Sequence, residues 1–136
     1  MDTLGLLRMS ERLNIPVYDF KTGDRKAFCF SNAIAMDFQR VENDREGKQI
    51  LAEEIGHILT NSLYPFHYCK ESLYRVNILK QECKARNFAS RLQVPLCELK
   101  KAIEVYHDDY EIAEALNVDL DILSEAVHYY RVKGLL

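Results

Sequence analysis

A change in the pattern of apolar residues near residue 45 is the feature that most constrains how this chain can fold. Before it, "PVYDF" and "KAFCFSNAIAMDF" are rich in aromatic and aliphatic residues, and the "KTGD" between them is typical of a turn. From Arg45 onward, apolar residues recur at helical spacing. Strands that are followed by helices predict an α+β fold, in which a small N-terminal sheet with a helix precedes a helical part.

The periodicity also predicts where the individual elements lie. Short strands are expected at about 16–20, 26–31 and 33–37. Helices are expected at 2–14, from Arg45 to about residue 59, and at about 71–92, 96–106, 109–116 and 120–133. At 136 residues the chain is long enough for one domain with a moderate core. We therefore expect a single domain over 1–136, divided into a helix and small sheet (1–44), two central helices (45–95) and C-terminal helices (96–136).

The charge and the apolar pattern exclude several classes of partner. A formal net charge of −3 gives no electrostatic reason to expect nucleic acid as a main partner. The N-terminal residues lack a secretion signal, and no stretch approaches the ~20 apolar residues that span a bilayer. We therefore expect a cytoplasmic protein without a membrane segment.

"EIAEALNVDLDILSEAV" has the pattern of a helix-turn-helix, but Asp119, Asp121 and Glu125 would repel phosphate. A packing or partner-binding role is favoured for it.

The segment "ILAEEIGHILTN" differs by one residue from His-Glu-x-x-His, the zinc-peptidase motif. Side chains four residues apart on a helix point the same way, so Glu53 and His57 could reach one ion. Glu54 lies ~100° further round the helix, where a carboxylate can serve as a general base toward water. Solvated carboxylates and a hydrogen-bonded histidine would give the same pattern, and the spacing leaves both readings open. Gly56 costs ~1 kcal/mol within a helix, which predicts that another backbone approaches closely there.

A catalytic zinc site needs a third protein ligand, and Glu82 is the best candidate. It lies on the second central helix, where Leu79, Ala85 and Ala89 would pack against the first. An acidic residue among such packing positions is placed to reach the same ion as Glu53.

Three residues after the first central helix are candidates for accessory roles. His67 could supply a substitute nitrogen ligand, although lone histidines rarely coordinate a metal. Tyr64 and Tyr68 could stabilise an oxyanion through their hydroxyls, or could pack at the mouth of a cleft.

Three segments carry a resemblance to a known family. "AIAMDFQRVENDREGKQILAEEIGHILTNSLYP", "ECKARNFASRLQVP" and "DDYEIAEALNVDLDILSEAVHYYRVKG" resemble the active-site helix with its preceding strand, the second motif and the C-terminal helices of the ImmA/IrrE metallopeptidases. That family occurs in phages and other mobile elements. The similarity covers about residues 14–133, nearly the whole chain.

The resemblance implies a site and a cofactor. It makes Glu53, His57 and Glu82 the metal ligands and Glu54 the general base, with zinc as the metal and manganese or iron as alternatives. The departure is Glu53, which stands where the family has its first histidine. A second anionic ligand would raise the pKa of metal-bound water and weaken the preference for zinc. Because imidazole suits zinc, we expect Glu53→His to improve zinc affinity.

The resemblance also implies a function, which stays open between two readings. The first is a metal-dependent endopeptidase that hydrolyses a peptide bond in a protein substrate, such as a phage-type transcriptional repressor. The alternative, which Glu53 favours, is a catalytically weakened or inactive homologue that acts as a protein-binding regulator in a phage or mobile element. In either case "KAFCFSNAIAMDF" is expected to provide a strand beside the site, to which a peptide could add.

Overall fold

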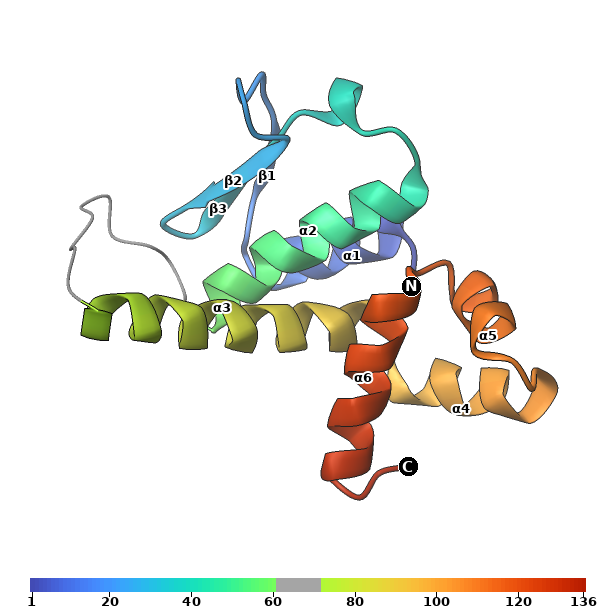
Figure 1. Ribbon diagram of the computed structural model, residues 1–136. Coiled ribbons are helices and arrows are strands. Elements are labelled where there is room, and N and C mark those ends of the chain that lie inside the picture. Colours follow the sequence, from blue (N-terminus) through green and yellow to red (C-terminus); the bar gives the residue numbers. More distant parts are fainter. Residues whose placement is uncertain (61–71) are drawn as a thin grey trace.

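A computed structural model describes residues 1–60 and 72–136 of the chain. A small sheet and one helix precede a series of helices, which confirms the predicted α+β fold (Figure 1). The elements are α1 (Thr3–Arg12), β1 (Val17–Asp19), β2 (Ala27–Phe30), β3 (Ala33–Met36), a 3₁₀ turn η1 (Phe38–Arg40), α2 (Asp44–Leu59), α3 (Ser72–Gln93), α4 (Leu96–Val105), α5 (Asp109–Leu116) and α6 (Leu120–Val132).

Polar residues at the helix ends explain where several helices begin and end. The side chains of Asp2 and Asn43 accept backbone N–H groups in the first turns of α1 and α2, at 2.8 and 2.9 Å. Asn117 ends α5 in the left-handed conformation, with φ at 53°. The first helix was expected to run to residue 14, but it ends at Arg12 because Asn14 adopts a positive φ of 57°.

The sheet places β3 between the other two strands, in the order β1-β3-β2. β3 runs parallel to β1 and antiparallel to β2, with Cys29 opposite Ile34. All four residues of β3 are buried. β2 is therefore an edge strand, and it packs against α2. This arrangement puts one sheet edge beside the helix that carries the expected motif.

The two central helices pack along each other, as predicted (Figure 1). Gly56 of α2 lies against the backbone of α3: a Cβ atom there would stand 2.7 Å from the Ala85 carbonyl oxygen and 3.6 Å from the Ala89 nitrogen. Contact at 2.7 Å is shorter than real Cβ atoms tolerate. The structure thus confirms the close backbone approach that the glycine predicted.

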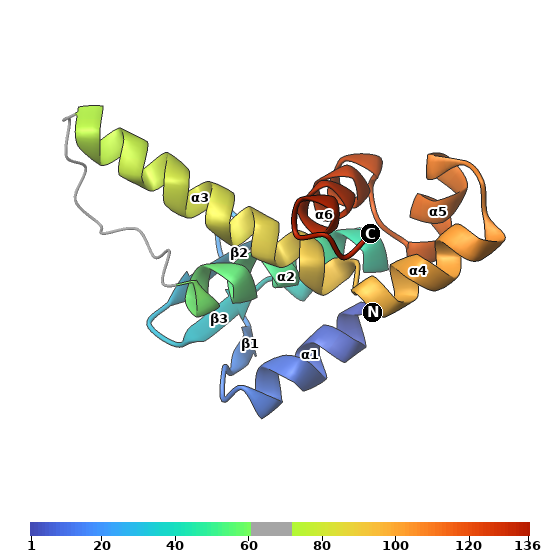
Figure 2. The same ribbon diagram turned by 90° about the horizontal axis from the view of Figure 1, so that it is seen from below.

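Two apolar clusters form the core, and α3 touches both. The first joins α1, the sheet and α2, and its buried members include Leu6, Ile34 and Leu51, with Ala89 from α3. The second joins α4, α5 and α6 to Val94, just beyond α3. In the view from below, α6 lies across the C-terminal half of α3 (Figure 2). The C-terminal helices thus brace the second central helix through α6.

The helix-turn-helix-like pair α5 and α6 is tied to α2 by polar contacts. Arg45 Nε donates to Asn117 Oδ1 at 3.2 Å. The fully buried Lys48 donates from Nζ to the carbonyl of Leu116 at 2.9 Å, at the C-terminus of α5. Desolvation lowers the pKa of Lys48. The turn of this motif is therefore occupied by contacts within the chain, in line with the packing role that its acidic residues favoured.

One further expectation concerns membranes. Among the residues that the structure describes, no helix has both the length and the hydropathy needed to cross a bilayer.

Candidate metal site between α2 and α3

The three side chains expected as metal ligands line one small pocket. Glu53 and His57 reach it from α2, while Glu82 reaches it from α3, together with Ala85 and Arg86. The pocket has a volume of about 50 Å³, and we call it the α2–α3 pocket. Glu82 is half-buried and faces α2 rather than the far side of its own helix. The helical spacing and the contact at Gly56 together produce this convergence.

The donors around the α2–α3 pocket match a divalent metal in kind and in location. Two carboxylates and an imidazole are ligands that zinc and manganese accept. Within residues 1–60 and 72–136, however, no group of three histidine, cysteine, aspartate or glutamate side chains is arranged to hold an ion. The donor side chains thus line the same pocket, but their donor atoms are not arranged around a common metal position.

Glu53, the residue that replaces a histidine, has a perturbed carboxyl group. Its side chain is exposed, and its Oε1 accepts a hydrogen bond from Gln49 Nε2 at 3.5 Å. Although part of the side chain is exposed, desolvation of its carboxyl group raises the pKa of Glu53, and the nearby Glu54 carboxylate adds to that rise. The Gln49 bond and the positive charge of Arg86 act in the opposite direction. Glu53 therefore takes up a proton at a higher pH than an ordinary glutamate.

Glu54, the expected general base, faces the sheet rather than the α2–α3 pocket. Its carboxylate lies beside the thiol of Cys29 on β2 and interacts with it electrostatically. Burial and the Glu54 charge together raise the pKa of Cys29 to about 12, so this thiol is protonated at neutral pH. The candidate base is thus held between α2 and the edge strand.

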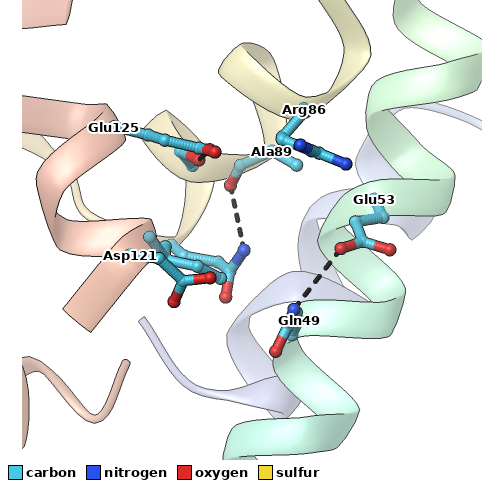
Figure 3. Close-up of a pocket in the computed structure, with 9 residues that line it drawn as sticks. Gln49, Glu53, Arg86, Ala89, Asp121 and Glu125 are labelled. Atoms are coloured by element: carbon cyan, nitrogen blue, oxygen red, sulfur yellow. Dashed lines mark hydrogen bonds between the residues drawn. The ribbon is translucent and has the colours of Figure 1, made fainter. Parts of the chain in front are cut away.

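A second, larger pocket of about 190 Å³ adjoins the first. Figure 3 shows Glu53 and Gln49 of α2 on one side of it, Asp121 and Glu125 of α6 on the other, and Arg86 reaching in from α3. Ser90 Oγ donates to Glu125 Oε2 at 2.7 Å on this wall. The two pockets share Glu53 and Arg86. The full lining is Gln49, Glu53, Arg86, Ala89, Ser90, Gln93, Asp121, Ile122 and Glu125.

Three residues at this site were not predicted from the sequence. Arg86 follows Glu82 by four positions and Gln49 precedes Glu53 by four, so helical spacing could have identified both. Cys29 gave no such signal, because its contact with Glu54 depends on how the sheet packs on α2.

The accessory candidates Tyr64, His67 and Tyr68 lie outside the described residues. Their roles stay predictions.

Comparison with known proteins agrees with the geometry. A family model described as the IrrE N-terminal-like domain, of the M78 peptidases, matches residues 10–128. No curated protein and no solved structure matches the chain. The matched range includes the sheet, both helices of the α2–α3 pocket and most of α6. This confirms the resemblance to the ImmA/IrrE proteins and implies a divalent metal and a protein substrate at the level of the family. The chain therefore belongs to the M78 family of metallopeptidases, which is defined by the IrrE N-terminal-like domain.

Proposed function

We propose that this chain is a metal-dependent endopeptidase whose site is the α2–α3 pocket. The observation that carries the proposal is that Glu53, His57 and Glu82 line one pocket of about 50 Å³. This volume has room for an ion with a water molecule. Zinc is the proposed metal, and the two carboxylates leave manganese or iron as alternatives. Binding would require the three side chains to turn further into the pocket.

Each residue then has a separate role. Glu53, His57 and Glu82 would hold the ion, which when bound supplies a Lewis acid for the scissile carbonyl and its attacking water. Glu54, which faces the sheet in the free protein, would turn toward the pocket, accept a proton from that water and donate it to the leaving amine. In the free protein the Glu54 carboxylate lies beside the Cys29 thiol.

The substrate is proposed to be a protein segment that binds in extended form. Among the described residues β2 pairs with β3 alone; it packs against α2, and its Cys29 lies beside Glu54. An extended peptide that adds to this edge would gain backbone hydrogen bonds. Such recognition needs no basic surface, which agrees with the net charge of −3. A phage-type repressor is the proposed example, following the resemblance to phage proteins.

A second function has an observation in its favour. The described residues show no closed group of three ligands, and Glu53 stands where the family motif has a histidine. The chain could therefore bind a protein segment at the β2 edge and regulate it without cutting it.

The substitution Glu54→Gln separates the two functions. It removes the base while keeping the ligands and the size of the side chain, so binding should persist and cleavage should fall by about 10²-fold or more. Cleavage of candidate repressor proteins, with zinc or manganese added, would be followed by mass spectrometry, and binding by titration calorimetry. Glu104→Gln on exposed α4 is a matched control and should change neither quantity. If the wild-type protein binds a repressor as tightly as Glu54→Gln does but cuts none, the regulatory reading replaces the peptidase reading.

A further inference from the structure

Arg86 places a positive charge at the candidate metal site. It follows Glu82 by one helical turn on α3 and lines the α2–α3 pocket with Glu53 and His57. It also lines the larger pocket, where Figure 3 shows it reaching from α3 toward the side on which Glu53 lies. The one cationic side chain common to both linings thus stands where a metal cation would have to bind.

The interaction between Arg86 and Glu53 acts across the pocket. Among the ion pairs of the described residues, none joins these two side chains directly. Both side chains nevertheless line both pockets, and at this short range a guanidinium attracts a carboxylate. In the free protein, Arg86 therefore stabilises the carboxylate that replaces a neutral histidine.

A metal ion would compete with this arrangement in two ways. A divalent ion in the α2–α3 pocket would be repelled by the guanidinium, which lines the same small space. Binding would also neutralise the Glu53 carboxylate and so remove its attraction to Arg86. Only the first effect would remain if residue 53 were a neutral histidine.

We propose that Arg86 is a tethered cation that competes with the metal ion for Glu53 and thereby lowers the metal affinity of the α2–α3 pocket. This inference rests on the proposed function, because it assumes that the pocket is the metal site. Arg86 would set how readily the pocket binds a metal ion. Its effect would depend on residue 53 being a glutamate in place of the histidine of the family motif.

The test is a zinc titration of the full chain against a chromophoric chelator at low ionic strength. Arg86→Gln should bind zinc about tenfold more tightly than wild type, because it removes both the repulsion and the competition for Glu53. Arg86→Lys keeps the charge and should stay near wild type. Lys84→Gln on the same helix is the matched control, since it makes the same charge change at an exposed position outside both pockets. Its zinc affinity should equal that of wild type.

A double-mutant cycle gives the decisive comparison. In a Glu53→His background, the gain from Arg86→Gln should shrink to a few-fold, because the competition for a carboxylate is gone. Equal gains in both backgrounds, or no gain in wild type, would overturn the inference.

Glu82→Gln distinguishes failure of the inference from failure of the proposed site. If Glu82→Gln weakens zinc binding while Arg86→Gln leaves it unchanged, the metal site stands and only the role of Arg86 is wrong. If Glu82→Gln has no effect in any background, the α2–α3 pocket is not the zinc site and both proposals fail.

Discussion

Cys29 illustrates how the fold changes the chemistry of a single side chain. The thiol lies on an edge strand, yet burial and the adjacent Glu54 carboxylate raise its pKa to about 12. The thiolate is the reactive form, so the fraction available at neutral pH is about a thousandfold smaller than for a thiol at the ordinary value of 9.0. Since the folded pKa lies above the unfolded one, folding also opposes ionisation, and the resulting loss of stability should grow between pH 9 and pH 12.

We therefore predict that Cys29 reacts with iodoacetamide far more slowly than the exposed Cys83 and Cys97. Time-resolved alkylation at neutral pH, followed by peptide mass spectrometry, measures each site separately. Unfolding in urea should bring all three rates close together, because the burial is then lost. If Cys29 reacts as fast as Cys97 in the native protein, its contact with Glu54 does not persist in solution.

At the scale of elements, the contact of α2 with α3 depends on one glycine. A Cβ atom at position 56 would stand 2.7 Å from the Ala85 carbonyl oxygen, which belongs to a helix backbone and cannot move alone. We predict that Gly56→Ala destabilises the protein by about 1–3 kcal/mol, the usual range for overpacking. This holds although alanine favours a helix over glycine by ~1 kcal/mol. Urea unfolding curves give the free energy of unfolding.

Gly47→Ala, on the same helix, is the matched control. Its added Cβ would meet side-chain atoms of Val41 and Thr3 at 3.2 and 3.3 Å, and such atoms can shift slightly. Its cost should be clearly smaller than that of Gly56→Ala. Equal costs at the two positions would mean that the backbone contact with α3 is not what position 56 requires.

Much of the element structure could be predicted from the sequence, because apolar periodicity is a local signal. The change in apolar pattern near residue 45 separated the strands from the helices that follow them. Gly56 indicated a close backbone contact before the contacting helix was known. What the periodicity could not give was local backbone geometry. α1 ends early because Asn14 adopts a left-handed conformation, and Asp119 directly precedes α6 but makes no side-chain capping bond and lies 3.7 Å from Arg45.

The predictions for the candidate site came from signals local to each helix. The i, i+4 spacing related Glu53 to His57, and packing positions around Glu82 indicated which way it faces. The contact between Cys29 and Glu54 could not be found in this way, because the strand's position on α2 depends on the fold as a whole. Arg86 was overlooked because its relevance depends on the charge at position 53, which lies on another helix.

At the scale of the whole molecule, two apolar clusters meet near the C-terminal end of α3 and are linked by polar contacts. Lys48 bonds to the end of α5, and Ser90 of α3 bonds to Glu125 of α6. Both clusters therefore support the helices that form the α2–α3 pocket. The C-terminal helices act here as a support for the site, and this use of α5 and α6 conflicts with presenting them to DNA.

The last prediction follows from that conflict. In a helix-turn-helix protein, the N-terminal part of the second helix enters the major groove. Here, Asp119 lies 3.7 Å from Arg45 of α2, Asp121 lines the larger pocket, and Glu125 accepts a bond from Ser90. This end of α6 is packed against the rest of the chain. It is also acidic, so it would repel the phosphate groups of DNA. We predict no duplex binding tighter than ~10⁻⁴ M at physiological salt, the weak limit of non-specific association. Fluorescence anisotropy with labelled mixed-sequence duplexes measures this, with and without zinc. Micromolar binding that weakens steeply with salt would show that the pair of helices does engage DNA and that its packing on α2 is only one of its states.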